Sequence, residues 1–428
     1  MGWGRKLALV AGAAALANGA TAQPAGQKVT GPVAVYWMSA QTQTGFGMPS
    51  AGGGGGRPDA SAMMRAMMGG GGASKTLQLD LGSSQTNAAP AADHLPPQGL
   101  QVGPKLPLLT PKPVTGQREE RENYVPEEYT KPKGRMLIFW GCGERARPGQ
   151  PYVIDFAKMA EGKQNPANFM RSIDYRPMNP PSLTRNRTYG GWPNEKTRDQ
   201  VPSNGSLVGA HMIKGNYSPD INFTLEEDQD FLAPLNVTSN AKAAGGFVPL
   251  GWNLVGNAQA YYASVVGGGE NDTVVMWSSS ETQASAFTNP DFLSQGDISR
   301  LVANKTLMGP GQKTCAVPKE VLDAAPSAMF QLVAYGGEAN FVYPPRPQDP
   351  KVTWNQQWAV KVRYRSATGG ILGQDMSEMM GGGGNSGRRA GRPAPGQPAQ
   401  QQQPPKPPSA ADILRQGILG GGLPFPRR

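Results

Sequence analysis

Methionine is the side chain whose type and spacing most clearly suggest chemistry. Met63, Met64, Met67 and Met68 lie between two glycine runs. On a helical turn, residues four apart share a face, so the four thioethers would form two pairs. Thioether sulfur is a soft ligand that suits Cu(I), and flexible methionines also form adaptable contact surfaces. Because the segment contains no histidine or cysteine, a low-complexity stretch is the preferred interpretation, with a copper site and a partner contact left open.

Residues for acid–base or zinc chemistry are sparse. The chain has two histidines, His94 and His211, which lie far apart in the sequence without a third partner near either. Neither a catalytic triad nor a zinc site is therefore predicted, and each histidine is expected to be exposed or satisfied by hydrogen bonds. The acidic run at 226–230 lacks the spacing of a known calcium loop, and we interpret it as a solvated turn. No catalytic residue, metal or cofactor is predicted.

The first 22 residues have the form of an export signal. Arg5 and Lys6 precede an apolar stretch at 7–17, and Ala20-Thr21-Ala22 is a small-residue cleavage site. Mature protein would begin at Gln23. No later run approaches the roughly 18 apolar residues of a membrane-spanning helix. We expect an exported protein of the periplasm or the extracellular space.

The only cysteines are Cys142 and Cys315. In an oxidising compartment an even pair favours a disulfide, and we predict one between them. Cys142 directly follows a predicted strand and lies between two glycines, so its thiol should lie at a strand end. The bond would then join two β units. Two separate buried thiols are the alternative.

Short runs rich in β-branched and aromatic residues predict a mainly β fold. The strands at 76–81 and 358–364 alternate in polarity, and one face of the first should be in contact with water. Helix signals are few, and one of them is Asp297 as a cap for a helix at 298–305. The other predicted strands are 33–39, 136–141, 152–156, 221–225, 258–266, 273–278 and 329–335.

Glycine and proline, with 57 and 41 residues, cluster mainly outside these strands. Such segments bury too little apolar surface to offset the entropy lost on ordering. Together with the strands, they divide the mature chain into predicted parts. These are an N-terminal strand region at 23–47, a Gly/Met-rich flexible loop at 48–75, a strand at 76–82, a Pro-rich linker at 83–134, a first β unit at 135–240, a second β unit at 241–370 and a disordered Gly/Pro/Gln-rich basic tail at 371–428.

Residues 246–366 carry the clearest local pattern. The segment 248–252 ends in an inward Trp, 258–262 contains Ala-x-x-Tyr, and 334–336 ends a late strand with Ala-Tyr-Gly. This order resembles a fibronectin type III-like or immunoglobulin-like β-sandwich, interrupted by a long insertion at 283–314. The resemblance implies an adhesive or spacer module with no chemistry of its own.

Most of the net charge of +10 lies in the C-terminal tail, where seven cations and one anion follow Asn385. Outside the cytoplasm, such a tail meets anionic lipid or wall polymer more readily than nucleic acid. We predict a weak, salt-sensitive attachment to anionic envelope polymer or lipid. A solubilising tail without a partner is the alternative. The predicted contact residues are Arg388, Arg389, Arg392, Arg427 and Arg428.

The expected fold is therefore two packed β-sandwich-like units with a Gly/Met-rich loop, a Pro-rich linker and a disordered C-terminal tail. The expected function is that of an exported, non-enzymatic binding or structural protein of the cell envelope. A protein partner is compatible with this function. A carboxylate-dependent hydrolase acting on envelope glycan is the alternative, and it would need two carboxylates across a cleft.

Overall fold

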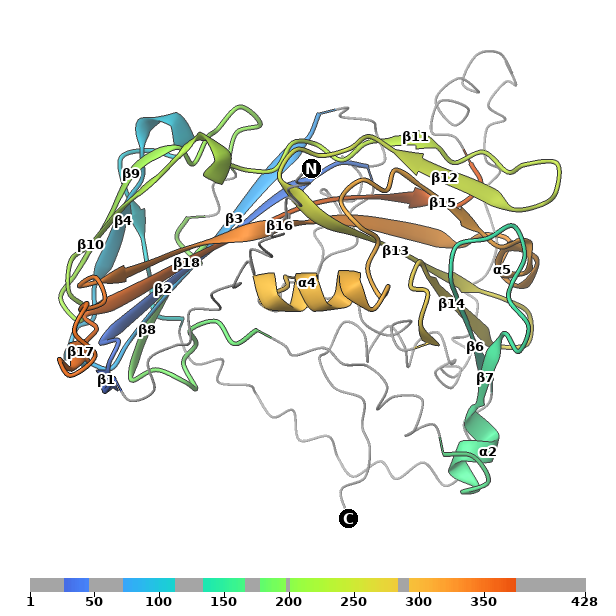
Figure 1. Cartoon of the computed structure of the whole chain (residues 1–428), viewed down its shortest axis with the longest axis horizontal. Coiled ribbons are helices and arrows are strands. Elements are labelled where there is room, and N and C mark those ends of the chain that lie inside the picture. Colours follow the sequence, from blue (N-terminus) through green and yellow to red (C-terminus); the bar gives the residue numbers. More distant parts are fainter. Residues whose placement is uncertain are drawn as a thin grey trace, which may run out of the picture.

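The computed structural model describes residues 27–45, 72–111, 134–165, 178–197, 201–283 and 292–374. Within them the fold is mainly β, as predicted, with a few short helices (Figure 1). The predicted signal peptide and most of the glycine-rich loop lie outside the described residues, as does nearly all of the tail. The same holds for Met63, Met64, Met67, Met68, Arg388, Arg389, Arg392, Arg427 and Arg428.

A nine-stranded sheet forms the centre of the molecule. Its two long middle strands, β16 and β18, pair antiparallel, whereas β18 with β2 and β14 with β6 pair parallel. Across the sheet the strands are β7 (Tyr152–Asp155), β6 (Arg135–Trp140), β14 (Thr273–Ser278), β13 (Ala258–Gly268), β16 (Met329–Tyr343), β18 (Trp358–Ile371), β2 (Ala34–Gln43), β3 (Ser74–Ser83) and β8 (Thr188–Trp192).

A four-stranded sheet packs on β2 and β3 and forms one sandwich with them (Figure 1). Side chains alternate across a strand, so β2 directs Tyr36, Met38 and Ala40 into this interface, where all three are fully buried. The Tyr36 ring meets Phe223 there, with ring centroids 6.4 Å apart. In order, the strands are β10 (Ile221–Leu225), β9 (Gly209–Gly215), β4 (Ala92–Leu95) and β5 (Leu106–Pro107).

A three-stranded sheet packs near the other end of the large sheet and forms the second sandwich. Its buried Trp252 meets Tyr261 of β13, with ring centroids 5.7 Å apart. The cores of both sandwiches belong to one continuous hydrophobic cluster. The strands are β11 (Val237–Ser239), β12 (Val248–Trp252) and β15 (Thr314–Val317).

The opposite face of the nine-stranded sheet is partly covered by helix α4 (Gln295–Ala303) (Figure 1). Ile298 and Leu301 of α4 pack with Tyr262 and Val333 of the sheet. Ser294 caps this helix by accepting a hydrogen bond from the Asp297 backbone, so the cap lies three residues before the predicted one. The remaining short elements are β1 (Val29–Thr30), η1 (Gln98–Leu100), α2 (Phe156–Ala160), η2 (Glu227–Gln229), α5 (Lys319–Ala324) and β17 (Trp354–Asn355).

The predicted Pro-rich linker at 83–134 is ordered over 84–111, where it supplies β4, β5 and η1. Leu100, Leu106 and Leu108 of this segment are buried. Proline is tolerated here because Pro107 lies in β5, an edge strand of the four-stranded sheet. Apolar residues separated by prolines show no periodicity, which is why the sequence indicated a linker.

Strands from both predicted β units share the nine-stranded sheet. β6, from 135–240, pairs in register with β14, from 241–370. β9 and β10, also from 135–240, lie in the four-stranded sheet of the other sandwich. The two sandwiches therefore combine segments far apart in the sequence, and residue 240 is not a boundary between them.

Candidate functional site

A band of polar side chains crosses the face of the nine-stranded sheet opposite the four-stranded sheet. The alternation that buries Tyr36 and Met38 places Trp37, Ser39 and Gln41 on this other face. Their cross-strand neighbours on β18 are all cations, and Trp37 and Ser39 pair with an acid and an amide on β3. On β16, Glu338 lies opposite Arg363 of β18. We call this band the polar face, and its members are Trp37, Ser39, Gln41, Gln78, Asp80, Tyr189, Glu338, Lys361, Arg363 and Arg365.

Two buried arginines from β18 form the centre of the polar face. Arg363 Nε donates to Ser39 Oγ and Arg365 Nε donates to Gln41 Oε1, each at 2.7 Å. Both guanidinium groups lie over the ring of Phe292, at 4.4 and 4.7 Å from its centroid. Arginine is rarely fully buried unless it is paired, and these hydrogen bonds and ring contacts hold both side chains in defined positions.

Asp80 lies at the β3 end of the polar face and is 2% exposed. The Tyr189 hydroxyl donates to Asp80 Oδ1 at 2.7 Å, and Gln78 Nε2 donates to Oδ2 at 3.2 Å. Burial raises the pKa of Asp80, while these two hydrogen bonds and the charge of Arg363 oppose that rise. Burial and the neighbouring Asp80 also raise the pKa of Tyr189, so its hydroxyl remains a donor at neutral pH.

Glu338 lies on β16, at the other end of the polar face. Its Oε2 forms an ion pair with Lys361, whose ammonium group lies 5.7 Å from the centroid of the Trp37 ring. The side chain is 6% exposed, and Oε1 is buried without a hydrogen-bond partner. A buried acceptor without a donor costs about 1–3 kcal/mol, so a hydrogen-bond donor that reached this oxygen would be stabilising.

Asp80 and Glu338 do not form a catalytic pair of carboxylates. Strands β2 and β18 lie between β3 and β16, and three strand spacings place their backbones about 14 Å apart. Side chains stand roughly perpendicular to a sheet, so the carboxyl groups keep this separation. Glycoside hydrolysis by paired carboxylates needs them about 5–9.5 Å apart.

The two histidines meet in the core of the first sandwich, on the far side of β2 from the polar face. His211 Nε2 lies 2.7 Å from the Leu207 carbonyl and must donate to it. His211 Nδ1 then accepts from His94 Nε2, at 2.9 Å. His94 Nδ1 accepts from the Tyr36 hydroxyl, at 2.8 Å. Burial lowers the pKa of both rings, that of His211 to about 4. Both imidazoles are therefore neutral at pH 7, and their hydrogen bonds form a buried structural network.

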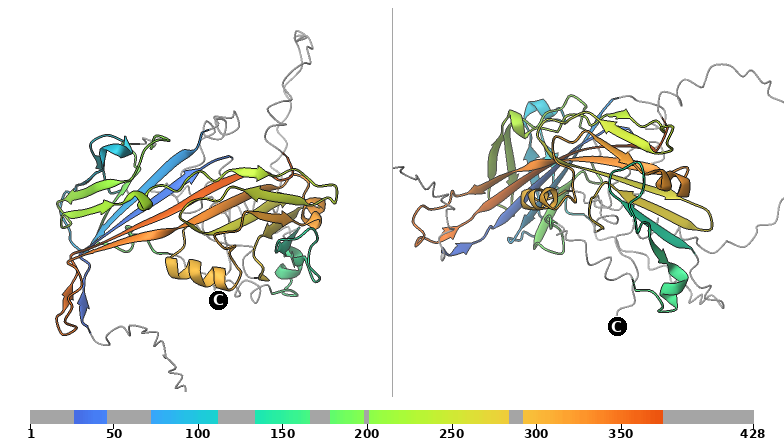
Figure 2. Two further views of the ribbon diagram at one scale, coloured as in Figure 1. Left: turned by 45° about the horizontal axis from the view of Figure 1, so that its top comes forward. Right: turned by 45° about the vertical axis from the view of Figure 1, so that its right-hand side comes forward.

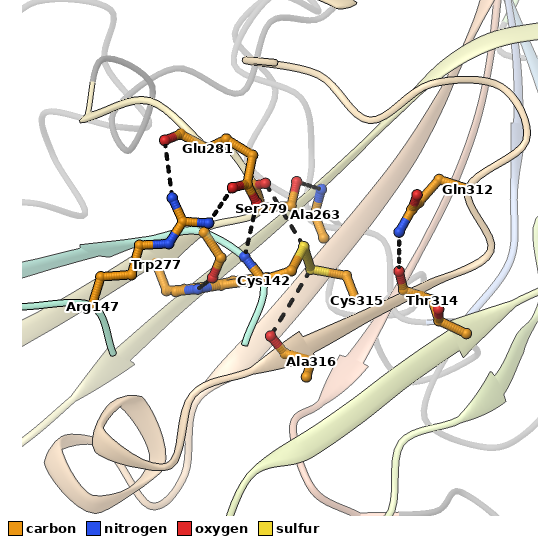
Figure 3. Close-up of a disulfide and its surroundings, with 11 residues drawn as sticks. Cys142, Arg147, Ala263, Trp277, Ser279, Glu281, Gln312, Thr314, Cys315 and Ala316 are labelled. Carbon is orange, nitrogen blue, oxygen red and sulfur yellow. Dashed lines mark hydrogen bonds and ion pairs between the residues drawn. A yellow bond between two sulfur atoms is a disulfide. The ribbon is translucent and has the colours of Figure 1, made fainter. Parts of the chain in front are cut away.

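The predicted disulfide is present between Cys142 and Cys315, with Cα atoms 5.1 Å apart (Figure 3). Cys142 lies two residues beyond the end of β6 and Cys315 lies in β15, so the bond joins the nine-stranded sheet to the three-stranded one. Beside it, Trp277 Nε1 donates to the Gly141 carbonyl at 3.0 Å, and Arg147 forms an ion pair with Glu281. These contacts give the bond a structural role.

The acidic run at 226–230 forms the short helix η2 and a turn. Asp230 accepts from the Ser206 hydroxyl at 2.6 Å and from the Leu207 backbone at 2.8 Å, which ties the turn to the segment before β9. Among the described residues, no group of three histidine, cysteine or acidic side chains could hold a metal ion.

Sequence reasoning singled out no residue of the polar face, although its signal was present. The strict alternation at 76–81 implied that Gln78 and Asp80 share one face. The alternation at 358–364 likewise set Lys361 and Arg363 opposite the apolar side chains. What the sequence does not reveal is that β3 and β18 lie on either side of β2, which makes the two polar rows one surface.

No known protein family matches this chain, and neither a curated protein nor a solved structure matches it. The resemblance of residues 246–366 to a fibronectin type III-like sandwich therefore stays a prediction. Among the helices of the described residues, none is long and apolar enough to cross a membrane.

Proposed function

We propose that this chain is an exported, non-enzymatic binding protein of the cell envelope, and that the polar face contacts its ligand. The observation that carries the proposal is the buried Glu338 Oε1, an acceptor without a donor, beside Lys361 and the half-buried Trp37. A ligand rich in hydroxyl groups would supply the missing donor. An envelope polysaccharide has that chemistry.

The surroundings of Glu338 suit such a ligand. Lys361 and Arg363 lie over the half-buried Trp37 ring, at 5.7 and 5.0 Å from its centroid. The apolar side of a sugar ring would pack on the part of the ring that these cations leave free. Gln41 and Gln78 are half-buried amides that both donate and accept hydrogen bonds, and Lys361 is a donor. A few polar groups fixed around an aromatic side chain are the usual composition of a ligand site.

The alternative, a carboxylate-dependent glycan hydrolase, receives less support from the geometry. Asp80 and Glu338 are too far apart to act on one glycosidic bond. Asp80 is held by Tyr189 and Gln78, and Glu338 by Lys361. These contacts favour binding over hydrolysis.

The basic tail remains a second proposed contact, through Arg388, Arg389, Arg392, Arg427 and Arg428, with anionic envelope polymer or lipid. This contact is electrostatic and exposed charges are screened within about 8 Å at physiological salt. Ligand binding at the polar face depends on hydrogen bonds and ring packing, so it should persist at higher salt.

The test is sedimentation of mature protein with purified peptidoglycan sacculi at high salt, which suppresses the contribution of the tail. Trp37→Leu and Glu338→Ala should each lower the bound fraction severalfold, because each removes a group that would contact the ligand. Thr224→Ala, an exposed position on β10, is the control and should bind as wild type does. Failure of wild-type protein to bind, or equal binding by Trp37→Leu, would contradict the proposal. Release of soluble sugar fragments by wild-type protein would favour the hydrolase.

A further inference from the structure

The connection between β16 and β18 forms a tip that extends beyond both sandwiches. We define the tip as residues 27–30 and 343–358, which include β1 and β17. Figure 2 shows it projecting from the body in two views, at the end of the long strands. The two segments are joined by parallel pairing of Val29 with Trp354 and of Thr30 with Asn355.

The tip is held in a defined conformation. Gln27 Nε2 donates to the Val352 carbonyl at 3.0 Å, and Gln27 Oε1 accepts from Arg346 Nε at 2.7 Å. Trp354 Nε1 donates to the Pro344 carbonyl at 2.8 Å. The ring of Tyr343 stacks on the Trp358 ring at the base of the tip, with centroids 5.6 Å apart. These contacts hold the backbone that carries the exposed side chains of the tip in one conformation.

Exposed hydrophobic side chains gather at this tip. Seven large hydrophobic residues are exposed in the described part of the chain, and three of them belong to the tip. Val29, Tyr343 and Val352 are each about half exposed, at 49%, 47% and 49%. Single exposed hydrophobic residues are ordinary, but three of them on one projection make it a candidate contact surface.

The tip is also basic. Lys28, Arg346 and Lys351 are exposed cations, and Asp349 is the one acidic residue in these two segments. The tip therefore combines exposed apolar side chains with cations, as interfacial membrane anchors do. Apolar groups enter the headgroup region while basic groups contact anionic lipid.

We propose that the tip is a peripheral docking site for an anionic phospholipid surface. A convex tip with short apolar side chains fits a deformable flat surface better than a protein groove. Tyrosine favours the boundary between headgroups and acyl chains. This inference is independent of the ligand proposed for the polar face, because the two surfaces share no residue.

The experiment places a fluorescent probe at the tip of the full mature chain. The described chain holds no free cysteine, so Val352→Cys supplies a single thiol for an environment-sensitive dye. With vesicles of equal phosphatidylglycerol and phosphatidylcholine, the emission should shift to the blue. Val153→Cys, an exposed position on edge strand β7, is the control and should show no shift.

Charge dependence is tested by the same assay. Lys28→Gln with Lys351→Gln should weaken vesicle affinity about fivefold per residue removed, and added salt should also weaken it. Binding to phosphatidylcholine alone at equal strength would overturn the proposal. So would sedimentation with anionic vesicles without a blue shift at position 352, since another segment would then make the contact.

Discussion

His94 Nε2 lies 2.9 Å from His211 Nδ1 in the core of the first sandwich, and these are the only two histidines of the chain. The pair connects the Tyr36 hydroxyl at one end to the Leu207 carbonyl at the other. Every donor in this chain of hydrogen bonds is matched to one acceptor. A proton added to His211 Nδ1 would face the N–H of His94 Nε2. A proton added to His94 Nδ1 would turn the Tyr36 oxygen into an acceptor and take away the acceptor of its O–H.

We predict that stability falls as pH drops from 7.5 to 5. Burial lowers the folded-state pKa of His211 to about 4, from an ordinary 6.5, so below pH 6.5 the unfolded chain binds a proton that the folded chain does not. The contribution of His211 to the free energy of unfolding is then fully present above pH 6.5 and is lost as pH falls towards 4. His211 alone should account for about 2 kcal/mol between pH 7.5 and 5, measurable by urea unfolding.

The protonation state of the two histidine rings can also be measured directly, by NMR. In folded protein with labelled histidine, both Cε1–H resonances should stay constant between pH 7.5 and 5. In urea-unfolded protein both should titrate near pH 6.5. A ring that titrates near pH 6.5 in folded protein would contradict the buried network.

About half of the eighteen strands in the described residues could be predicted from the sequence, because these strands are runs of β-branched and aromatic residues. Ile221–Leu225 was predicted with its observed bounds, and the segments at 152–156 and 273–278 differ by at most one residue. The disulfide was predicted from the expected oxidising compartment and from the even number of cysteines. These are local signals, so they can be recognised in the sequence without knowledge of the fold.

The sheet order and the candidate site could not be predicted. β2 lies between β18 and β3 although more than 300 residues separate it from β18, and no local pattern reports such a pairing. His94 and His211 likewise meet only because β4 and β9 are neighbours. The burial of 84–111 arises from contacts with β8 and β9, so its proline-rich composition was misleading.

The disulfide should contribute strongly to stability. It closes a separation of 173 residues, and the chain-entropy model assigns about 5 kcal/mol to a loop of this size. The double variant Cys142→Ser/Cys315→Ser should unfold at lower urea concentration than oxidised wild type. Reduced wild-type protein is the matched control and should resemble the variant. A loss below about 1 kcal/mol in both would show that the two sheets hold together without the bond.

Removing the Tyr189 hydroxyl should destabilise the polar face. Tyr189→Phe would take one donor away from the buried Asp80 carboxylate, at a cost of about 1–3 kcal/mol. Asp80→Asn should cost less, because its amide oxygen can still accept from Tyr189. Tyr343→Phe, at an exposed hydroxyl on the tip, is the control for loss of a tyrosine hydroxyl. Equal unfolding free energies for Tyr189→Phe and Tyr343→Phe would show that the Asp80 contact contributes nothing.

Gly190 of β8 tests whether the segment at 84–111 is part of the fold. A Cβ at this position would lie 2.6 Å from the Tyr217 hydroxyl oxygen and 2.7 Å from the Leu108 carbonyl oxygen. Gly190→Ala must therefore push the 106–109 segment away from β8, and overpacking of this kind costs about 1–3 kcal/mol. Gly309→Ala, where a Cβ meets nothing within 4 Å, is the matched control and should unfold at the same urea concentration as wild type.

Hydrogen exchange should show which segment is disturbed by Gly190→Ala. Exchange should become faster at the Leu108 and Leu109 amides, which donate to the Ala92 and Gly191 carbonyls. If Gly190→Ala matched Gly309→Ala in both measurements, residues 106–109 would not pack against β8, and the predicted linker would be the better description of that segment.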